Sequence, residues 1–281
     1  MELKFTKMHG CGNDYIYINC FDQTVEDPAA LAVSLSRPHF GVGSDGVILI
    51  CPSDTADAKM RMFNADGSEG KMCGNGIRCV GKYLYDNGMA GRRTEVTVET
   101  LSGIKRLHLT AKDGKMLSAR VDMGRAVLSP PEIPVYLDGS SIVASPLVVD
   151  EKVYHITCVS MGNPHCVVFL KESVDLLDLR RIGPKFENNP LFPERVNTEF
   201  VNVQPDGGLK MRVWERGSGE TLACGTGACA VGVAAVLNGY CGKDTDIAVH
   251  LRGGDLTVRY TDDAVFLSGP ATTVFEGTIH L

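Results

Sequence analysis

Residues 72–76, Met72-Cys73-Gly74-Asn75-Gly76, and residues 223–227, Ala223-Cys224-Gly225-Thr226-Gly227, are two copies of one motif. They lie inside a longer repeat, in which residues 61–110 align without a gap with residues 212–261 and share 14 of the 50 aligned residues. A repeat of this length predicts two similar half-molecules. If the halves face each other, each cysteine lies on one side of a common cleft. That arrangement would remove a proton from one face of a carbon and return it to the other.

The composition is that of an ordinary soluble globular protein. The chain has 281 residues, of which 44% are hydrophobic and 22% charged, so one large or two medium domains are expected. The net charge of −6 argues against binding nucleic acid through phosphate neutralisation. No apolar stretch approaches membrane-spanning length, and the first residues lack an apolar signal core. We therefore expect a cytoplasmic protein without nucleic-acid or membrane partners.

Ten cysteines are many for such a chain. Without a signal sequence a disulfide framework is not expected, and most of the thiols should be buried as small hydrophobic groups. The spacings from Cys73 to Cys79 and from Cys224 to Cys229 are too wide for zinc knuckles, and no matching histidine pair follows. We expect no metal site.

Each repeat predicts a helix directly after its cysteine. Ile77, Val80 and Leu84 follow helical spacing, and residues 228–237 are apolar nearly all round, which predicts a deeply buried helix. Both segments end in Asn-Gly, a left-handed cap signal. Short alternating segments separated by Gly or Asp-Gly predict antiparallel strands, and they lie at residues 95–99, 105–109, 247–251, 256–260 and 265–267.

These patterns predict an α+β fold of two pseudo-symmetric domains, each a barrel-like, mostly antiparallel sheet around a central helix, with the active site in the cleft between them. We assign residues 1–122 plus 269–281 to the N-terminal domain and residues 123–268 to the C-terminal domain. Residues 127–134 are rich in proline and predict a linker. Residues 274–280 predict a last strand that returns to the first domain.

A Cys-Gly-x-Gly sequence at a helix start has a definite chemistry. The first helical N–H groups lack intrahelical partners, and together with the helix dipole they form a site for a carboxylate. The same groups stabilise a thiolate. For either motif alone, a buried cysteine at a tight helix start is the favoured explanation. Their duplication at equivalent positions favours a catalytic pair acting next to a substrate carboxylate.

The loops before the two cysteines differ. Asn64 aligns with Glu215, and Ala65 with Arg216. Arg216 is a candidate clamp for a second carboxylate and Glu215 for an ammonium, although a solvated surface pair explains both equally well. Asparagines at turns and an interior histidine have ordinary structural explanations, which by themselves are favoured for Asn13, Asn163, Asn197 and His165.

At these motifs the chain resembles the diaminopimelate epimerase family. The matching segments span nearly the whole chain in the family's order: residues 7–14, 43–46, 63–68 and 72–79 in the first half, and residues 162–165, 196–199, 214–217 and 223–227 in the second. The resemblance implies a cofactor-independent homodimer that interconverts LL- and meso-diaminopimelate in lysine and peptidoglycan precursor biosynthesis. It also implies the two-domain fold predicted above.

Motif by motif, the resemblance assigns roles to single residues. Cys73 and Cys224 become the acid/base thiols, and His165 and Glu215 become candidates for tuning them. Substrate-binding roles fall on Asn13, Ser44, Asn64, Gly74, Asn75, Asn163, Asn197, Glu215, Arg216, Gly225 and Thr226. The first turns of both helices would hold the reacting carboxylate, and Asn13 would lie near the reacting centre. The distal amino-acid head would be held by the side chains of Asn64, Asn163, Asn197, Glu215 and Arg216.

Other functions are compatible with part of the pattern. Proline racemases and hydroxyproline epimerases share the fold and the thiol pair, but they typically have His at the position of Asn75 and lack the Glu215-Arg216 pair. A related group of isomerases uses a carboxylate instead of thiols. A redox sensor would use the two thiols as a switch. A racemase dependent on pyridoxal phosphate would show an aldimine absorbance band.

Overall fold

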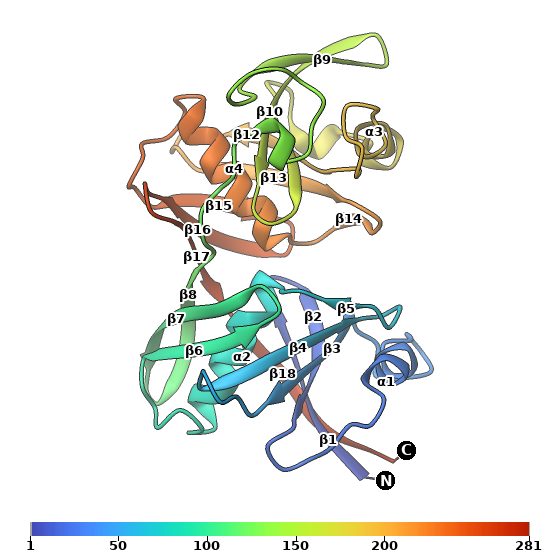
Figure 1. Cartoon of the computed structure of the whole chain (residues 1–281), viewed down its shortest axis with the longest axis vertical. Helices are drawn as coiled ribbons and strands as arrows, with labels where there is room; N and C mark the ends of the chain where they lie inside the picture. Colours follow the sequence, from blue (N-terminus) through green and yellow to red (C-terminus); the bar gives the residue numbers. More distant parts are fainter. Residues whose placement is uncertain (1, 281) are drawn as a thin grey trace. The chain divides into compact units, whose positions relative to one another are not determined.

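The structure is a computed structural model in which residues 2–280 are described, and it divides into two compact units. Unit 1 comprises the chain up to Asp122 and again from Ser268, and unit 2 comprises Met123–Leu267. Both units are rich in strands and contain few helices (Figure 1). None of the helices in residues 2–280 is long and apolar enough to cross a membrane.

Unit 1 is a mixed sheet curled around one helix. Its elements are β1 (Glu2–Gly10), β2 (Asn13–Asn19), α1 (Pro28–Leu35), β3 (Gly46–Cys51), β4 (Ala58–Asn64), β5 (Glu69–Gly70), α2 (Gly74–Asp86), β6 (Glu95–Thr100), β7 (Gly103–Lys112), β8 (Lys115–Asp122) and β18 (Thr272–His280). Pairing runs β18-β1-β2-β3-β4-β6-β7-β8, with β5 beside β4. Helix α2 packs against β1, β2, β6, β7 and β8. Because no pairing among the described residues joins β18 to β8, the sheet is open rather than a closed barrel.

Unit 2 repeats this plan. Its elements are the 3₁₀ turn η1 (Pro130–Glu132), β9 (Ser145–Val149), β10 (Lys152–Ser160), β11 (Pro164–Phe169), the 3₁₀ turn η2 (Val174–Leu176), α3 (Leu179–Glu187), β12 (Asn197–Val203), β13 (Leu209–Glu215), β14 (Gly219–Thr221), α4 (Gly225–Leu237), β15 (Ile247–Leu251), β16 (Gly254–Tyr260) and β17 (Val265–Pro270), which ends beyond the unit boundary. Pairing runs β9-β10-β11-β12-β13-β15-β16, with β14 beside β13. Helix α4 packs against β10 to β13, β15 and β16.

The predicted duplication is confirmed in the fold. Helices α2 and α4 have the same length and the same 151-residue offset as the sequence repeat, and so do β4 and β13. Even a surface ion pair recurs: Arg61 Nε lies 2.8 Å from Glu69 Oε1, and Arg212 Nε lies 2.8 Å from Glu220 Oε1. In each unit this pair joins the two strands of the hairpin that precedes the cysteine. The hairpin is thereby held in the same geometry in both halves.

Both predicted central helices are confirmed. Most side chains of α4 are buried on every side, as its apolar sequence requires. Each helix ends at its Asn-Gly, where Gly88 has φ +69° and Gly239 has φ +75°, values that favour glycine. The predicted strands are also present, several of them longer than expected.

Two features of the fold differ from expectation. Residues 127–134 are not a free linker, because Val127 forms a β-bridge with Ser160 and the side chains of Pro130 and Ile133 are buried within unit 2. Helices α1 and α3 were not predicted from the sequence, although Asp27 and Asp178 cap them. Each of these helices connects two parallel strands, β2 with β3 and β11 with β12, so the sheets are mixed.

Candidate active site

Each of the two cysteines is the N-cap residue of its central helix. Cys73 and Cys224 have similar extended backbone angles, with φ −128° and ψ 119° for Cys73 and φ −119° and ψ 113° for Cys224. In each motif the sulfur accepts a hydrogen bond from the amide of the second glycine, Gly76 or Gly227, at 3.3 Å. A side chain in this position receives the helix N–H groups directly, so the helix stabilises negative charge on both sulfurs.

The predicted binding residues of each unit include several that lie at one end of three neighbouring inner strands of its sheet. In unit 1, Asn13 begins β2, and Asn64 ends β4 opposite Gly46, the first residue of β3. In unit 2, Asn163 lies just before β11, Asn197 begins β12 and Glu215 ends β13. The helix carrying the cysteine starts a few residues after the short strand that follows, β5 in unit 1 and β14 in unit 2. Each unit therefore carries one residue cluster of the same design, and we call this cluster the half-site of its unit.

In the first half-site the amide oxygen of Asn13 faces the sulfur. Cys73 Sγ lies 3.2 Å from Asn13 Oδ1, and Asn75 Nδ2 lies 3.4 Å from the same oxygen. The other end of the Asn13 amide donates to Asp45 Oδ2 at 2.7 Å. Because the carboxylate of Asp45 can only accept in this contact, it directs the nitrogen of Asn13 toward itself and the oxygen toward Cys73. This orientation suits a protonated sulfur that donates its hydrogen.

The buried side chain of Arg78 holds the first turn of α2 in position through hydrogen bonds. Arg78 has no exposed surface, and its guanidinium donates to Gly74 O at 2.9 Å, to Asn75 Oδ1 at 2.9 Å and to Pro270 O at 3.2 Å. These bonds fix the two residues directly after Cys73. The amides of that turn are the groups expected to bind a carboxylate, and Arg78 holds the backbone that carries them.

Replacing Arg78 with methionine should lower the free energy of unfolding by about 2–4 kcal/mol, because the buried acceptors of Gly74 and Asn75 and the carbonyl of Pro270 lose their charged donor while the side-chain volume is nearly kept. Urea unfolding followed by circular dichroism measures the loss. The matched control is Arg106→Met on exposed β7, where a change within about 0.5 kcal/mol is expected. Equal stability of the two variants would refute the role of Arg78.

The second half-site contains a chain of hydrogen bonds. Cys224 Sγ lies 3.5 Å from Thr226 Oγ1, which accepts from Asn163 Nδ2 at 3.3 Å. Asn163 Oδ1 lies 3.0 Å from His165 Nε2, and His165 Nδ1 lies 2.7 Å from Glu199 Oε1. His165 and Glu199 have no exposed surface. The half-sites thus differ in the orientation of an asparagine amide. Asn163 directs its nitrogen toward Thr226, which contacts the sulfur of Cys224, whereas Asn13 directs its oxygen toward the sulfur of Cys73.

Glu215 adds a second carboxylate beside Cys224. Burial raises the pKa of Glu215, while hydrogen bonds from Thr221 and from the Cys224 thiol lower it. Burial also raises the pKa of the Cys224 thiol well above its usual value, and the charges of Glu215 and Glu199 raise it further. The hydroxyl of Thr226 and the amide of Gly227 act in the opposite direction. The protonation of Cys224 is therefore set by a balance between carboxylates and hydrogen-bond donors.

The remaining predicted residues make contacts that position loops. Ser44 Oγ donates to Gly46 O at 2.9 Å, and Asn64 Nδ2 donates to Ser68 Oγ at 2.9 Å. Asn197 joins two loops, since its Nδ2 donates to Pro164 O at 2.8 Å and its Oδ1 accepts from the Arg216 amide at 2.9 Å. The guanidinium of Arg216 donates to Glu194 O at 2.9 Å.

Three side chains of these half-sites were not singled out by sequence reasoning. Asp45 orients Asn13, Arg78 anchors the first turn of α2, and Glu199 supports His165. All three occur inside the quoted motifs. Their function follows only from contacts between distant strands, so spacing gave no signal for it.

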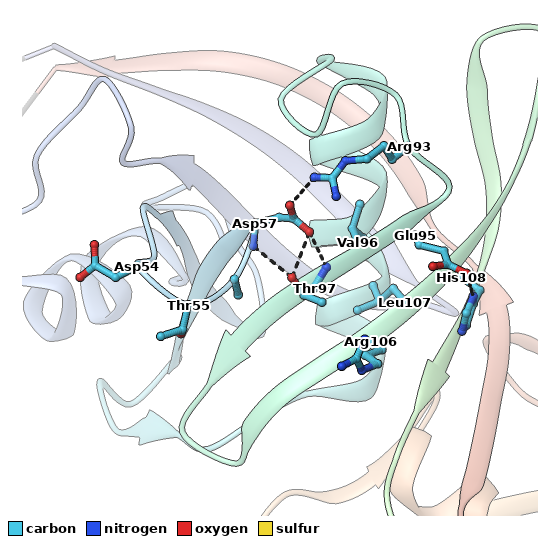
Figure 2. A pocket seen from close by; sticks show the side chains of 11 residues that line it. Asp54, Thr55, Asp57, Arg93, Glu95, Val96, Thr97, Arg106, Leu107 and His108 are labelled. Atoms are coloured by element: carbon cyan, nitrogen blue, oxygen red, sulfur yellow. Dashed lines mark hydrogen bonds and ion pairs between the residues drawn. The ribbon is translucent and has the colours of Figure 1, made fainter.

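A surface pocket of about 440 Å³ in unit 1 lies apart from these residues. Figure 2 shows its polar wall, where Asp57 accepts from Arg93 and from the amide of Thr97, the latter at 2.7 Å. His108 lies 3.2 Å from Glu95. The polar groups of this wall bond mainly to one another, and the pocket contains none of the predicted site residues. We assign no activity to it.

Comparison with known proteins identifies the family. The sequence model of the family described as diaminopimelate epimerase matches residues 5–129 and 157–274. The chain is 56% identical over 281 residues to a diaminopimelate epimerase of Acetivibrio thermocellus, covering 99% of both chains. It is 52% identical to one of Methanococcus maripaludis, covering 99% of this chain and 100% of the relative.

Solved structures with low sequence identity share the fold. A hydroxyproline epimerase from Agrobacterium vitis superposes with a TM-score of 0.73 at 17% identity, covering 100% of this chain and 93% of that one. A phenazine biosynthesis protein of the PhzF family from Bacillus anthracis gives 0.70 at 17% identity, with full coverage of both chains. The fold is therefore common to several activities, whereas the sequence match is specific, and this chain belongs to the diaminopimelate epimerase family.

Proposed function

We propose that this protein interconverts LL- and meso-diaminopimelate by moving a proton between two thiols through the substrate α-carbon, without a cofactor. The observation that carries the proposal is the duplicated N-cap cysteine, because inversion by this route needs one acid/base group for each face of the carbon. Family membership at 56% identity supports the substrate and the reaction. The product serves lysine and peptidoglycan precursor biosynthesis.

The proposed reaction balances without any other reagent. A thiolate at one cysteine takes the α-proton, and the electron pair of the broken C–H bond moves onto the adjacent carboxylate. The thiol at the other cysteine then gives its proton to the opposite face of the carbon. The substrate leaves inverted, and the enzyme is left with the protonation states of its two cysteines exchanged. Cys73 and Cys224 are the groups we assign to these two steps.

The helix N-termini supply the stabilisation that the carbanion requires. We propose that backbone amides at Gly74, Asn75, Gly225 and Thr226 hold the reacting carboxylate, where charge accumulates in the transition state. Asn13 would lie near the reacting carbon. Asn64, Asn163, Asn197, Glu215 and Arg216 would bind the distal amino-acid head, with Ser44 as a further contact. Binding the distal head fixes the position of the reacting carbon.

Incubation of the purified protein with LL-diaminopimelate in D₂O tests the proposal. We expect deuterium at one α-carbon and formation of the meso isomer, with no cofactor added, as measured by proton NMR and chiral separation. L-Proline and trans-4-hydroxy-L-proline are the comparison substrates, because structures of that activity share the fold. Exchange with those substrates and none with diaminopimelate would overturn the assignment.

We further propose that the protein is a cytoplasmic homodimer, as the family resemblance implies. Sedimentation equilibrium would show twice the 30.3 kDa chain mass, and a monomer at micromolar concentration would refute the dimer.

A further inference from the structure

We propose that Glu199 is a positioning residue for Cys224, which acts through His165 and Asn163 to hold the hydroxyl of Thr226 as a hydrogen-bond donor to the sulfur. The inference deepens the proposed function, since it concerns one of the two proposed acid/base groups. It rests on the series of contacts that joins five side chains of unit 2 from β12 to the start of α4.

The direction in which the hydrogen bonds of this series donate follows from the buried pair at its far end, His165 and Glu199. His165 and Glu199 have no exposed surface, and a net charge there would be costly. The pair is neutral when Nε2 of His165 carries a proton and one further proton is shared between Nδ1 and Glu199. A protonated Nε2 can only donate, so it selects the oxygen of the Asn163 amide as its partner.

That choice fixes every later hydrogen bond. With its oxygen directed to His165, Asn163 presents its nitrogen to Thr226 Oγ1 at 3.3 Å. The threonine oxygen then accepts from Asn163, and its own hydrogen is left to donate to Cys224 Sγ, 3.5 Å away. All donors in the series therefore point toward the sulfur. A thiolate needs such a donor more than a thiol does.

The carboxylate of Glu199 lies directly against helix α4. A Cβ added to Gly227 would lie 2.6 Å from Glu199 Oε1, so the carboxylate packs against the first turn of α4. At the equivalent place under α2, a Cβ on Gly76 would lie 2.6 Å from Ile48 Cδ1. The first half-site thus has an apolar group where the second has a carboxylate. Within residues 2–280, only Oε1 of Glu199 bonds, while Oε2 lacks a partner.

Glu199 also acts on the sulfur through space, with the opposite sign. The ionisable groups facing this region are His165 and Cys166 from β11, Glu199 from β12, Glu215 from β13 and Cys224 itself. The share of negative charge that Glu199 keeps within the shared-proton pair disfavours a thiolate at Cys224, whereas the orientation of Thr226 favours one. A test must therefore compare two variants that both lack the charge and differ only in hydrogen bonding.

Glu199→Gln and Glu199→Met form that pair. Glutamine can donate to Nδ1 of His165 and keep the proton on Nε2, whereas methionine leaves Nδ1 without a partner and the orientation of Asn163 free. The measured quantity is the rate of iodoacetamide alkylation of Cys224, followed by peptide mass spectrometry, as a function of pH. We expect the midpoint of this profile to lie about one pH unit higher in the methionine variant than in the glutamine variant. This corresponds to roughly tenfold slower alkylation below the midpoint. The acidic limb of kcat/KM should move in the same direction.

Two further variants protect the test against a folding defect. Thr226→Val removes only the last donor, so it should shift the alkylation profile of Cys224 to higher pH, as loss of the oriented donor does in the methionine variant. Adding Thr226→Val to Glu199→Met should shift the profile no further. Thr198→Val, next to Glu199, removes a buried hydroxyl that lacks a hydrogen-bond partner within residues 2–280, and it should behave like the wild type. Coincident alkylation profiles for the glutamine and methionine variants would overturn the proposal. Alkylation needs no substrate, so this outcome is independent of the epimerase assignment.

Discussion

Cys73→Ala and Cys224→Ala should each reduce the rate of inversion by about 10⁴-fold or more, because each removes one of the two groups that exchange the proton. The loss should appear in kcat as well as in kcat/KM, since the missing thiol acts only in the chemical step. Chiral separation of the product mixture measures it. The serine variants should keep their shape and still lose most of the rate, because a hydroxyl is a much poorer base at neutral pH.

Isotope exchange sharpens this prediction. In D₂O the remaining thiolate of a single variant can still remove a proton and return a deuteron to the same face. We therefore expect each alanine variant to exchange the α-hydrogen of only one isomer, without inversion, and the two variants to exchange opposite isomers. Cys241→Ala, which removes a partly exposed thiol of unit 2 that has no proposed role, is the control and should retain wild-type rates. Near-normal inversion in both variants would disprove the thiol pair.

Much of the fold was predictable because the repeat and the helix signals agree locally. The apolar sequence of α4 requires burial on every side, and the Asn-Gly caps end both central helices where the structure ends them. Helices α1 and α3 escaped prediction because they are short and their capping residues, Asp27 and Asp178, resemble ordinary turn residues. The segment 127–134 was misjudged because proline-rich sequence also suits a buried, bridged loop.

The positions of the two cysteines at helix starts were predictable, whereas the orientations of the asparagine side chains beside them were not. Both cysteines could be located from the motif, since the motif itself specifies an N-cap. The opposite orientations of Asn13 and Asn163 depend on partners from other strands, Asp45 in one unit and His165 in the other. Hydrogen-bond direction is set by such long-range contacts. A single sequence does not encode them in any local spacing.

Glu215→Gln should have the second-largest effect, a fall in kcat/KM of about 10²–10³-fold. We assign Glu215 to the ammonium of the distal head, and loss of a charge-assisted hydrogen bond in a partly buried site is worth about 3–4 kcal/mol. Because that interaction positions the substrate, KM should rise and kcat should fall together. Steady-state kinetics with LL-diaminopimelate measure both. Glu220→Gln, on the same hairpin but paired with Arg212 and Arg252, should change kcat/KM less than about twofold.

The same substitution makes an independent prediction about Cys224. The charge of Glu215 raises the pKa of the Cys224 thiol, so glutamine should lower it, and alkylation of Cys224 should begin at lower pH than in the wild type. This shift has the opposite sign to that expected for Thr226→Val, which removes a donor. An unchanged alkylation profile with a raised KM would restrict Glu215 to substrate binding, and a shifted profile with an unchanged KM would restrict it to tuning the thiol. If both quantities change, one carboxylate holds the substrate and sets the protonation of the group that attacks it.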